Sequence, residues 1–239
     1  MKKSKFFLYL FCVLFVFPNK TIAQTETEYI EYAKSSFPRL KELLAIPNDA
    51  HFPKDIEKNV QWCEKHFSQR GFKTTRLETA TVPLLLAERK IKKRKAKTVL
   101  IYLQVDGQPV DPNHWFQDNP YEATLKVASP EGGWEIIPWE KLMEKEINPD
   151  WRIFARSTAD SKGAVNMFLT AVDMMLDKKQ WSNFNIKVIM DFEEEIGSPQ
   201  LPKAVVDYKE QLASDMLVIF DGPRHLQNEP TLTLSLIHI

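Results

Sequence analysis

Hydrophobic residues along this chain switch repeatedly between helical and strand spacing. Apolar residues recur every three to four positions over residues 28–44 and again over 53–71, which predicts two amphipathic helices. Short apolar runs typical of strands follow at 72–77, 82–87 and 98–103, and the last is continuous enough to be buried on both faces. Alternation of this kind predicts an α/β fold, in which helices cover a sheet.

The second half of the chain continues the pattern after a polar interruption. Residues 106–150 are rich in Pro, Asn, Gly and Trp and are expected to run over the surface at one end of the sheet. Further strands are predicted at 151–155, 184–192 and 216–220, the last short and buried, and another helix at 201–212. A helix after the first of these strands is expected to turn one apolar face inward, formed by Val165, Phe168, Leu169, Val172, Met175 and Leu176.

Residues 1–23 have the pattern of a cleavable bacterial signal peptide. Lys2, Lys3 and Lys5 precede an apolar run at 6–17, and small residues follow at the end of the segment. The run is shorter than the roughly 20 apolar residues that a bilayer span needs, so an uncleaved anchor is the alternative. The sequence predicts a mature chain that begins at Gln24 and is secreted or periplasmic, with no membrane attachment after cleavage.

Charge and cysteine content exclude some classes of protein. The whole chain has 32 basic and 32 acidic residues, and loss of the signal segment removes lysines but no acid, so the mature protein is mildly acidic. The one basic run, at 90–97, lacks interleaved aromatic residues and is expected to be a solvated hairpin, so no nucleic-acid surface is predicted. Once Cys12 leaves with the signal, Cys63 alone cannot close an internal disulfide.

The C-terminal end departs from the pattern of a finished domain. Residues 231–233 resemble the start of a strand, and 234–239 match one reading frame of a commonly used transposon-end sequencing adaptor. We therefore expect residues 24–233 to be the N-terminal part of a longer domain and 234–239 to be non-native. Sequencing across this junction in intact genomic DNA tests the hypothesis, since an in-frame stop directly after Ile239 would contradict it.

Acidic residues stand where four predicted strands end, at Asp106, Asp160, 193–195 and Asp221. The carboxyl ends of strands border the crevice in which open α/β sheets bind ligands, so these side chains can converge. Carboxylates gathered in one place repel each other unless a cation keeps them ionised, and carboxylate and imidazole ligands suit zinc. Two metal ions can also share one bridging carboxylate. The pattern therefore predicts a divalent metal site.

Glycines near these acids support a built site, although each acid alone has a simpler interpretation. Four of the seven glycines in the chain lie within three residues of one of the acids, and glycine permits the tight turns that such loops need; they are Gly107, Gly163, Gly197 and Gly222. A single strand-end aspartate is usually a turn former or a helix cap, and residues 193–195 alone are more often a solvated charge run. The interpretation depends on four strand ends in order.

Four sequence blocks resemble a known enzyme family. They are Gln104–Pro112 with Trp115, then Ala155–Gly163, Glu193–Ser198 and Ile219–Gly222. In this order they are similar to the co-catalytic zinc metallopeptidases that include aminoacylase, carnosinase, carboxypeptidase G and succinyl-diaminopimelate desuccinylase, and the likeness covers nearly all of 24–233. The resemblance implies the N-terminal part of a three-layer helix–sheet–helix catalytic domain that cleaves an amide bond in a small peptide or N-acyl amino acid.

The resemblance also implies roles for individual residues. Asp160 would bridge two zinc ions, Glu195 would bind one of them and Asp221 the other. Glu194 would be the general base that takes a proton from the attacking water and passes it to the leaving amine. Asp106 would orient the metal-binding histidine that the family carries two residues earlier. A smaller lid domain, which makes a homodimer in the family, and a last metal-binding histidine would lie beyond this sequence.

This chain departs from the family pattern at Gln104, which stands where the family has that histidine. A glutamine offers only a neutral amide oxygen, so the site could use Gln104 as a weak ligand, hold a single metal, or be degenerate. His114 and His225 are alternative sources of imidazole, although surface or substrate contact is the simpler interpretation of both. Two further hypotheses stay open: a catalytically impaired relative that retains the fold for binding, and an unrelated binding protein with acidic strand ends.

Overall fold

A central five-stranded sheet organises the chain. The computed structural model describes residues 26–222; the predicted signal peptide, His225, the 231–233 strand start and the 234–239 tail lie outside the described residues. The strand order is β1-β2-β7-β3-β8. These strands are β1 Lys73–Leu77, β2 Leu84–Arg89, β3 Thr98–Gln104, β7 Asn185–Asp191 and β8 Met216–Ile219. β3 runs parallel to both β7 and β8, whereas β2 is antiparallel to β7.

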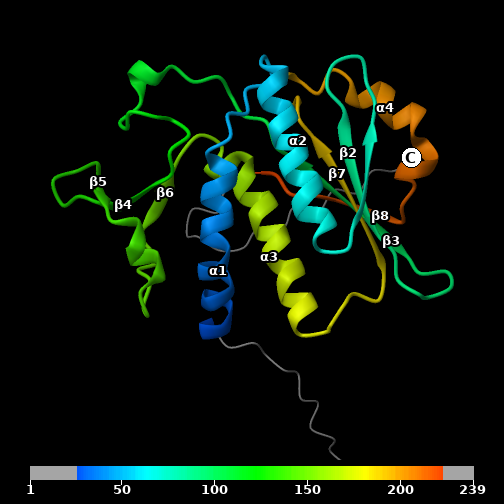
Figure 1. Ribbon diagram of the computed structural model, residues 1–239, viewed down its shortest axis with the longest axis horizontal. Coiled ribbons are helices and arrows are strands. Elements are labelled where there is room, and N and C mark those ends of the chain that lie inside the picture. The colour runs from blue at the N-terminus through cyan, green and yellow to red at the C-terminus, as the bar shows by residue number, and fades with distance from the viewer. Residues whose placement is uncertain (1–25, 223–239) are drawn as a thin grey trace, which may run out of the picture.

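Helices cover both faces of this sheet, which confirms the predicted three-layer α/β class. Figure 1 shows α1, α2 and α3 together in front of the sheet, with α4 on the far side of β2. Their bounds are α1 Glu26–Leu44, α2 Pro53–Ser68, α3 Gly163–Asp177, α4 Leu201–Asp207 and α5 Lys209–Leu212. The predicted helix at 201–212 is therefore two helices, and the break is at Tyr208.

Continuous apolar runs in the strands follow from burial on both faces. In β2, Leu85 and Ala87 join the cluster formed with α2 and α3, whereas Leu84 and Leu86 join the cluster that includes Ala204 and Leu212. Successive strand side chains point to opposite faces, so each face receives every second residue. The predicted inward face of α3 is confirmed, since Val165, Phe168, Leu169 and Val172 are buried and Met175 and Leu176 pack against the same core.

A second, three-stranded sheet accounts for the polar interruption. Its order is β5-β4-β6, with β4 Thr124–Ala128, β5 Trp134–Ile137 and β6 Arg152–Phe154. The prediction of a plain surface excursion at 106–150 was thus incomplete, and β6 pairs with β4, not with the central sheet. Ile153 and Ala155 pack against Leu40 and Leu44 of α1, which attaches this sheet to the helical layer. Short one-turn segments complete the fold at Pro112–His114, Trp139–Met143, Thr158–Lys162 and Glu194–Ile196.

Two further sequence predictions were wrong. The basic run at 90–97 is a loop and no hairpin, because β7 lies between β2 and β3 in the sheet. β8 was expected to be buried, yet Met216, Leu217 and Ile219 are each more than half exposed. The reason is position, since β8 pairs with β3 alone among strands of residues 26–222.

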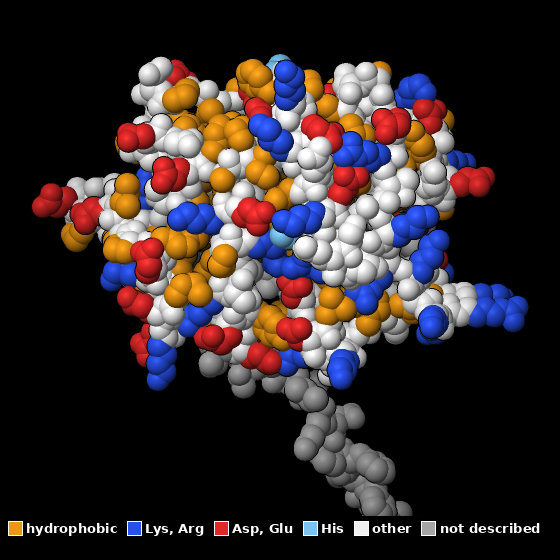
Figure 2. Space-filling view, viewed as in Figure 1, with side chains coloured by type: hydrophobic (Ala, Val, Ile, Leu, Met, Phe, Trp, Pro, Cys, Tyr) orange, Lys and Arg blue, Asp and Glu red, His pale blue; other side chains and the backbone are white. Residues whose placement is uncertain are grey.

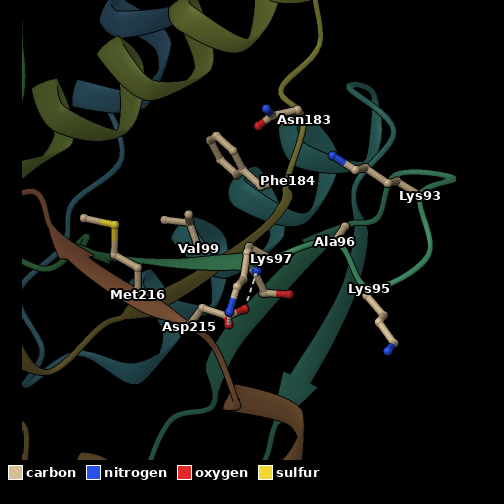
Figure 3. Close-up of a pocket in the computed structure, with 10 residues that line it drawn as sticks. Lys93, Lys95, Ala96, Lys97, Val99, Asn183, Phe184, Asp215 and Met216 are labelled. Atoms are coloured by element: carbon tan, nitrogen blue, oxygen red, sulfur yellow. Dashed lines mark hydrogen bonds and ion pairs between the residues drawn. The ribbon is translucent and has the colours of Figure 1, made fainter.

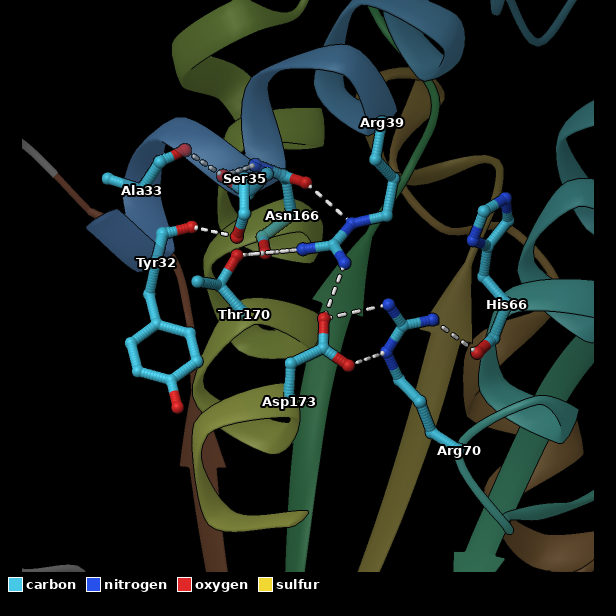
Figure 4. A network of polar contacts seen from close by, with 10 residues as sticks. Tyr32, Ala33, Ser35, Arg39, His66, Arg70, Asn166, Thr170 and Asp173 are labelled. Carbon is cyan, nitrogen blue, oxygen red and sulfur yellow. Dashed lines mark hydrogen bonds and ion pairs between the residues drawn. The ribbon is translucent and has the colours of Figure 1, made fainter. Parts of the chain in front are cut away.

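A charged network ties the three helices of one layer together. Asp173 of α3 accepts hydrogen bonds from Arg39 of α1 at 2.6 Å and from Arg70, just after α2, at 2.7 and 2.8 Å (Figure 4). Arg39 also donates to Asn166 and Thr170, and Arg70 to the carbonyl of His66. Both guanidinium groups are nearly buried, so the single carboxylate compensates two desolvated cations.

The surface of the described part is mixed in charge. Figure 2 shows acidic and basic side chains interspersed over the face that α1, α2 and α3 form. No helix within residues 26–222 is long and apolar enough to cross a membrane.

Candidate active site

Three parallel strands of the central sheet end at the same edge. β3, β7 and β8 run in one direction, so their carboxyl ends, at Gln104, Asp191 and Ile219, lie together. Predicted site residues follow directly after each of them, at Asp106, 193–195 and Asp221. This edge is where open α/β sheets bind ligands.

Asp160 reaches the same edge by a different route. Gln104 Nε2 donates to Asp160 Oδ1 at 2.6 Å, so the segment 158–162 lies against the end of β3. Asp160 does not end a strand of the central sheet, because β6 belongs to the small sheet. The sequence thus predicted that Asp160 lies at this edge, but it was wrong to expect Asp160 at the end of a strand of the central sheet.

Glu194 lies among the remaining acids. Burial raises the pKa of Glu194, and the nearby carboxylates of Glu195, Asp221 and Asp160 raise it further. Gln108 Nε2 donates to Glu195 Oε2 at 2.6 Å, which holds that carboxylate from the loop after β3. Acids from three separate segments are therefore gathered around Glu194.

Asp106 connects two of these segments. Its side chain is fully buried, and Oδ2 accepts a hydrogen bond from the backbone N–H of Glu195 at 3.0 Å. Burial raises the pKa of Asp106 to about 7, although the backbone N–H groups of Glu195 and Glu194 act in the opposite direction. The aspartate fixes the backbone of the loop that carries Glu194.

The comparisons with known proteins identify the family. The model of peptidase family M20/M25/M40 matches residues 101–232, which is more than half of the chain. The chain belongs to this peptidase family. A cysteinylglycine-S-conjugate dipeptidase of Corynebacterium striatum is 25% identical over 91% of this chain and 44% of its own length. A Beta-Ala-His dipeptidase of Mus musculus is 29% identical over 63% of this chain and 26% of its own length.

Solved structures show the same fold. The M20 family metallo-carboxypeptidase Sso-CP2 from Sulfolobus solfataricus superposes with a TM-score of 0.64 at 26% identity, over 82% of this chain and 39% of that one. This M20 chain therefore spans less than half the length of the relatives it matches. The predicted family and fold class are confirmed.

The oxygen atoms at this edge suit a divalent cation, although the acids alone do not form a complete metal site. Among residues 26–222, no three His, Cys, Asp or Glu side chains lie close enough together to hold an ion. Two buried acceptors at the end of β3 nevertheless lack a hydrogen-bond partner, namely Gln104 Oε1 and Asp106 Oδ1. Unpartnered buried oxygens are costly and need a donor or a cation, so the residues of this M20 site fit a metal.

The three histidines within residues 26–222 contact other partners. His114 Nδ1 lies 3.1 Å from Asp111 Oδ2 and is largely exposed, and His51 pairs in the same way with Asp49. His66 stacks on Trp62 within the helical layer. Each of these three therefore has a partner other than the acids around Glu194.

Sequence reasoning missed the residues that support the loop with Glu194 and Glu195 and the segment that follows β3. Asp191 Oδ2 accepts from Ser198 Oγ at 2.7 Å and from the Tyr102 hydroxyl at 3.1 Å, which closes the loop that carries Glu194 and Glu195. Another supporting residue is Asn48, whose Nδ2 donates to Val105 O at 2.7 Å and to Ser157 Oγ at 3.0 Å. No local pattern marks these residues, because their contacts join distant segments.

Glycine is needed at positions 107 and 163 because other atoms lie close to the backbone there, not because the chain makes a tight turn. A Cβ atom at Gly107 would lie 2.0 Å from Ser157 Oγ, and one at Gly163 would lie 2.2 Å from the carbonyl oxygen of Thr158. Neither glycine has a positive φ. The sequence identified both positions but gave the wrong physical reason for them.

Lys162 anchors the segment that carries Asp160. Its side chain is fully buried, and Nζ donates to the carbonyl oxygens of Leu43 at 2.9 Å and Ile46 at 2.5 Å, just beyond the end of α1. Burial lowers the pKa of Lys162 to about 7. A solvated lysine titrates near pH 10.4, so between these values the unfolded chain binds more protons and stability rises with pH.

Lys162→Met is expected to remove this pH dependence. The free energy of unfolding of the wild type should rise relative to that of the variant by up to about 1.4 kcal/mol per pH unit, over roughly pH 7 to 9. Urea unfolding of both proteins across that range measures the effect. Lys203→Met, at an exposed lysine of α4, is the control and should follow the wild type. A constant difference between wild type and Lys162→Met would contradict the assignment.

A separate cavity lies at the opposite edge of the sheet. It has a volume of about 460 Å³ and borders the starts of β3 and β8, with Val99, Phe184 and Met216 on one side and Lys93, Lys95 and Lys97 around it (Figure 3). Lys97 pairs with Asp215 at 2.5 Å. β3 begins at this cavity and ends at the acidic edge, so the cavity takes no part in the candidate active site.

Proposed function

We propose that this chain is the N-terminal part of a metal-dependent hydrolase that cleaves the amide bond of a dipeptide or an N-acyl amino acid. One observation carries the proposal: Asp160, Glu195 and Asp221 come from three separate segments and all lie near Glu194 at the carboxyl edge of the sheet. Membership of a peptidase family and the dipeptidase relatives support the class of reaction.

Each residue has a distinct task in this proposal. Asp160, Glu195 and Asp221 would hold zinc, with Asp160 shared between two ions. Bound zinc would polarise the scissile carbonyl and lower the pKa of the attacking water. Glu194 would accept the proton of that water and deliver it to the leaving amine.

Asp106 would act through the backbone, not on the substrate. Because its carboxylate accepts the N–H of Glu195, it fixes the loop on which the base and one ligand stand. Neighbouring glutamates can have separate tasks here, since Glu195 is held by Gln108 while no hydrogen bond to another side chain holds Glu194 among the described residues.

The rest of the proposal concerns the whole protein. We place it outside the cytoplasm on the basis of the signal pattern at 1–23, and we expect a lid domain beyond residue 233 to form the homodimer and contact the substrate carboxylate. The domain that begins at residue 24 would then be completed by later sequence.

Metal removal tests the proposed activity. The complete protein, expressed from its full gene, should hydrolyse Cys-Gly or β-Ala-His, lose activity in EDTA and regain it when Zn²⁺ or Mn²⁺ is added back. Release of free amino acids measured by chromatography is the readout, with an N-acetyl amino acid as the alternative substrate. A protein that is folded, binds metal and cleaves none of these substrates would support the alternative, an impaired relative in which Gln104 has removed activity.

A further inference from the structure

The structure assigns Gln104 as a metal ligand through its amide oxygen. A site with this oxygen should favour an oxygen-seeking cation such as Mn²⁺ more strongly than a site with an imidazole at the same position. This inference rests on the proposed function and adds the identity of a ligand and the class of cation. Three observations carry it: the fixed position of the side chain, two unpartnered acceptors, and the chemistry of the donor atoms.

Gln104 occupies a fixed position next to Asp160. It is the last residue of β3, is paired with Asp191 of β7, and is only 2% exposed. Its Nε2 lies 2.6 Å from Asp160 Oδ1, so the amide group is already at hydrogen-bond distance from the carboxylate. A cation bound by Asp160 would therefore lie within reach of the Gln104 amide.

Gln104 and Asp106 each keep one buried oxygen without a hydrogen-bond partner. Gln104 Oε1 and Asp106 Oδ1 are both buried and neither has a partner in the described structure. Residues 104 and 106 are two apart in an extended segment, so their side chains leave the same face. A buried acceptor without a donor is costly, so each of these oxygens can accept a donor or bind a cation.

Rotation of the Gln104 amide by half a turn would bring its oxygen to a bound cation. The rotation exchanges Oε1 and Nε2, so the oxygen takes the place from which Nε2 donates to Asp160. Without a cation the rotated form is unfavourable, because Oε1 would then face the Asp160 carboxylate. The cation thus decides the orientation of the amide.

Oxygen donors determine which cation gains most. Carboxylate and carbonyl oxygens suit Mg²⁺, Ca²⁺ and Mn²⁺, whereas imidazole suits zinc. Gln104, which contacts Asp160, can offer a cation only its amide oxygen, and the acids proposed as ligands offer carboxylate oxygens. Relative to a site with histidine at this position, the affinity for Zn²⁺ should fall more than the affinity for Mn²⁺.

Calorimetric titration with Mn²⁺ and Zn²⁺ alone tests the inference. Gln104→Leu removes the oxygen and should weaken Mn²⁺ binding about tenfold or more, a scale typical of changes around metal ligands. Gln104→His should raise the ratio of Zn²⁺ to Mn²⁺ affinity by about tenfold or more, since it restores an imidazole. Gln61→Leu is the matched control: Gln61 also donates to a carboxylate, that of Glu57, but lies exposed on α2, and Mn²⁺ binding should stay unchanged within error.

A spectroscopic readout separates ligation from a general structural effect. In ¹⁵N-labelled protein, the side-chain amide resonance of Gln104, identified by its loss in Gln104→Leu, should shift on saturation with Mg²⁺. Mn²⁺ binding equal to wild type in Gln104→Leu, or an unchanged affinity ratio in Gln104→His, overturns this inference alone. Absence of metal binding in the folded wild type overturns the proposed function as well.

Discussion

We expect Glu194→Gln to lower kcat for dipeptide hydrolysis by the complete protein about 10²- to 10⁴-fold, the range typical of removing a general base. Glutamine has nearly the same shape but cannot accept a proton, and Glu194 is not one of the proposed metal ligands. Metal content and KM should therefore change little. Steady-state kinetics on the complete protein, together with metal analysis of the same samples, measure both quantities.

The control for this variant is Glu210→Gln, which makes the same chemical change at an exposed glutamate of α5. It should keep the activity of the wild type. If Glu194→Gln kept wild-type kcat while the control did too, Glu194 would not be the base, and another group would have to move the proton.

Asp173→Ala should lower the free energy of unfolding by about 3 kcal/mol, because it leaves two nearly buried guanidinium groups without their shared carboxylate. The loss should affect the packing of all three helices in this layer. Urea unfolding followed by circular dichroism measures it, and the matched control is Asp207→Ala on α4, whose ion pair with Lys203 is exposed.

The control should stay within about 0.5 kcal/mol of the wild type, as expected of an exposed site. An effect of Asp173→Ala no larger than that of the control would mean that water or rearranged side chains compensate Arg39 and Arg70 without the aspartate.

Local pattern was enough to predict most elements of the fold. The apolar run of β3 indicated a strand covered on both faces, and the spacing in α3 identified its buried side, because burial follows the periodicity of each element. Pattern could not say which strands are neighbours. β6 has the residues of a strand but joins the small sheet, and β8 is apolar yet exposed, since pairing and coverage depend on distant segments.

The candidate site divides in the same way. The acids at strand ends were found because a strand followed by an acid is a local signal, and the family was suggested by the resemblance of four sequence blocks in order. The supporting contacts had no such signal: Asn48 bonds to Val105 and Ser157, 57 and 109 residues away. For Gln104, the sequence left three explanations open, and the contact with Asp160 and the unpartnered oxygen support the proposal that it is a ligand.

The central claim is that carboxylates from separate segments bind a cation at one edge of the sheet. Anomalous diffraction at the zinc absorption edge, on crystals of the complete protein soaked in Zn²⁺, tests it most directly. We expect a peak with a carboxylate oxygen of Asp160 about 2.0–2.2 Å away, and with Glu195 or Asp221 in the same coordination shell. Zinc bound elsewhere, with Asp160, Glu195 and Asp221 facing solvent in different directions, would contradict the account.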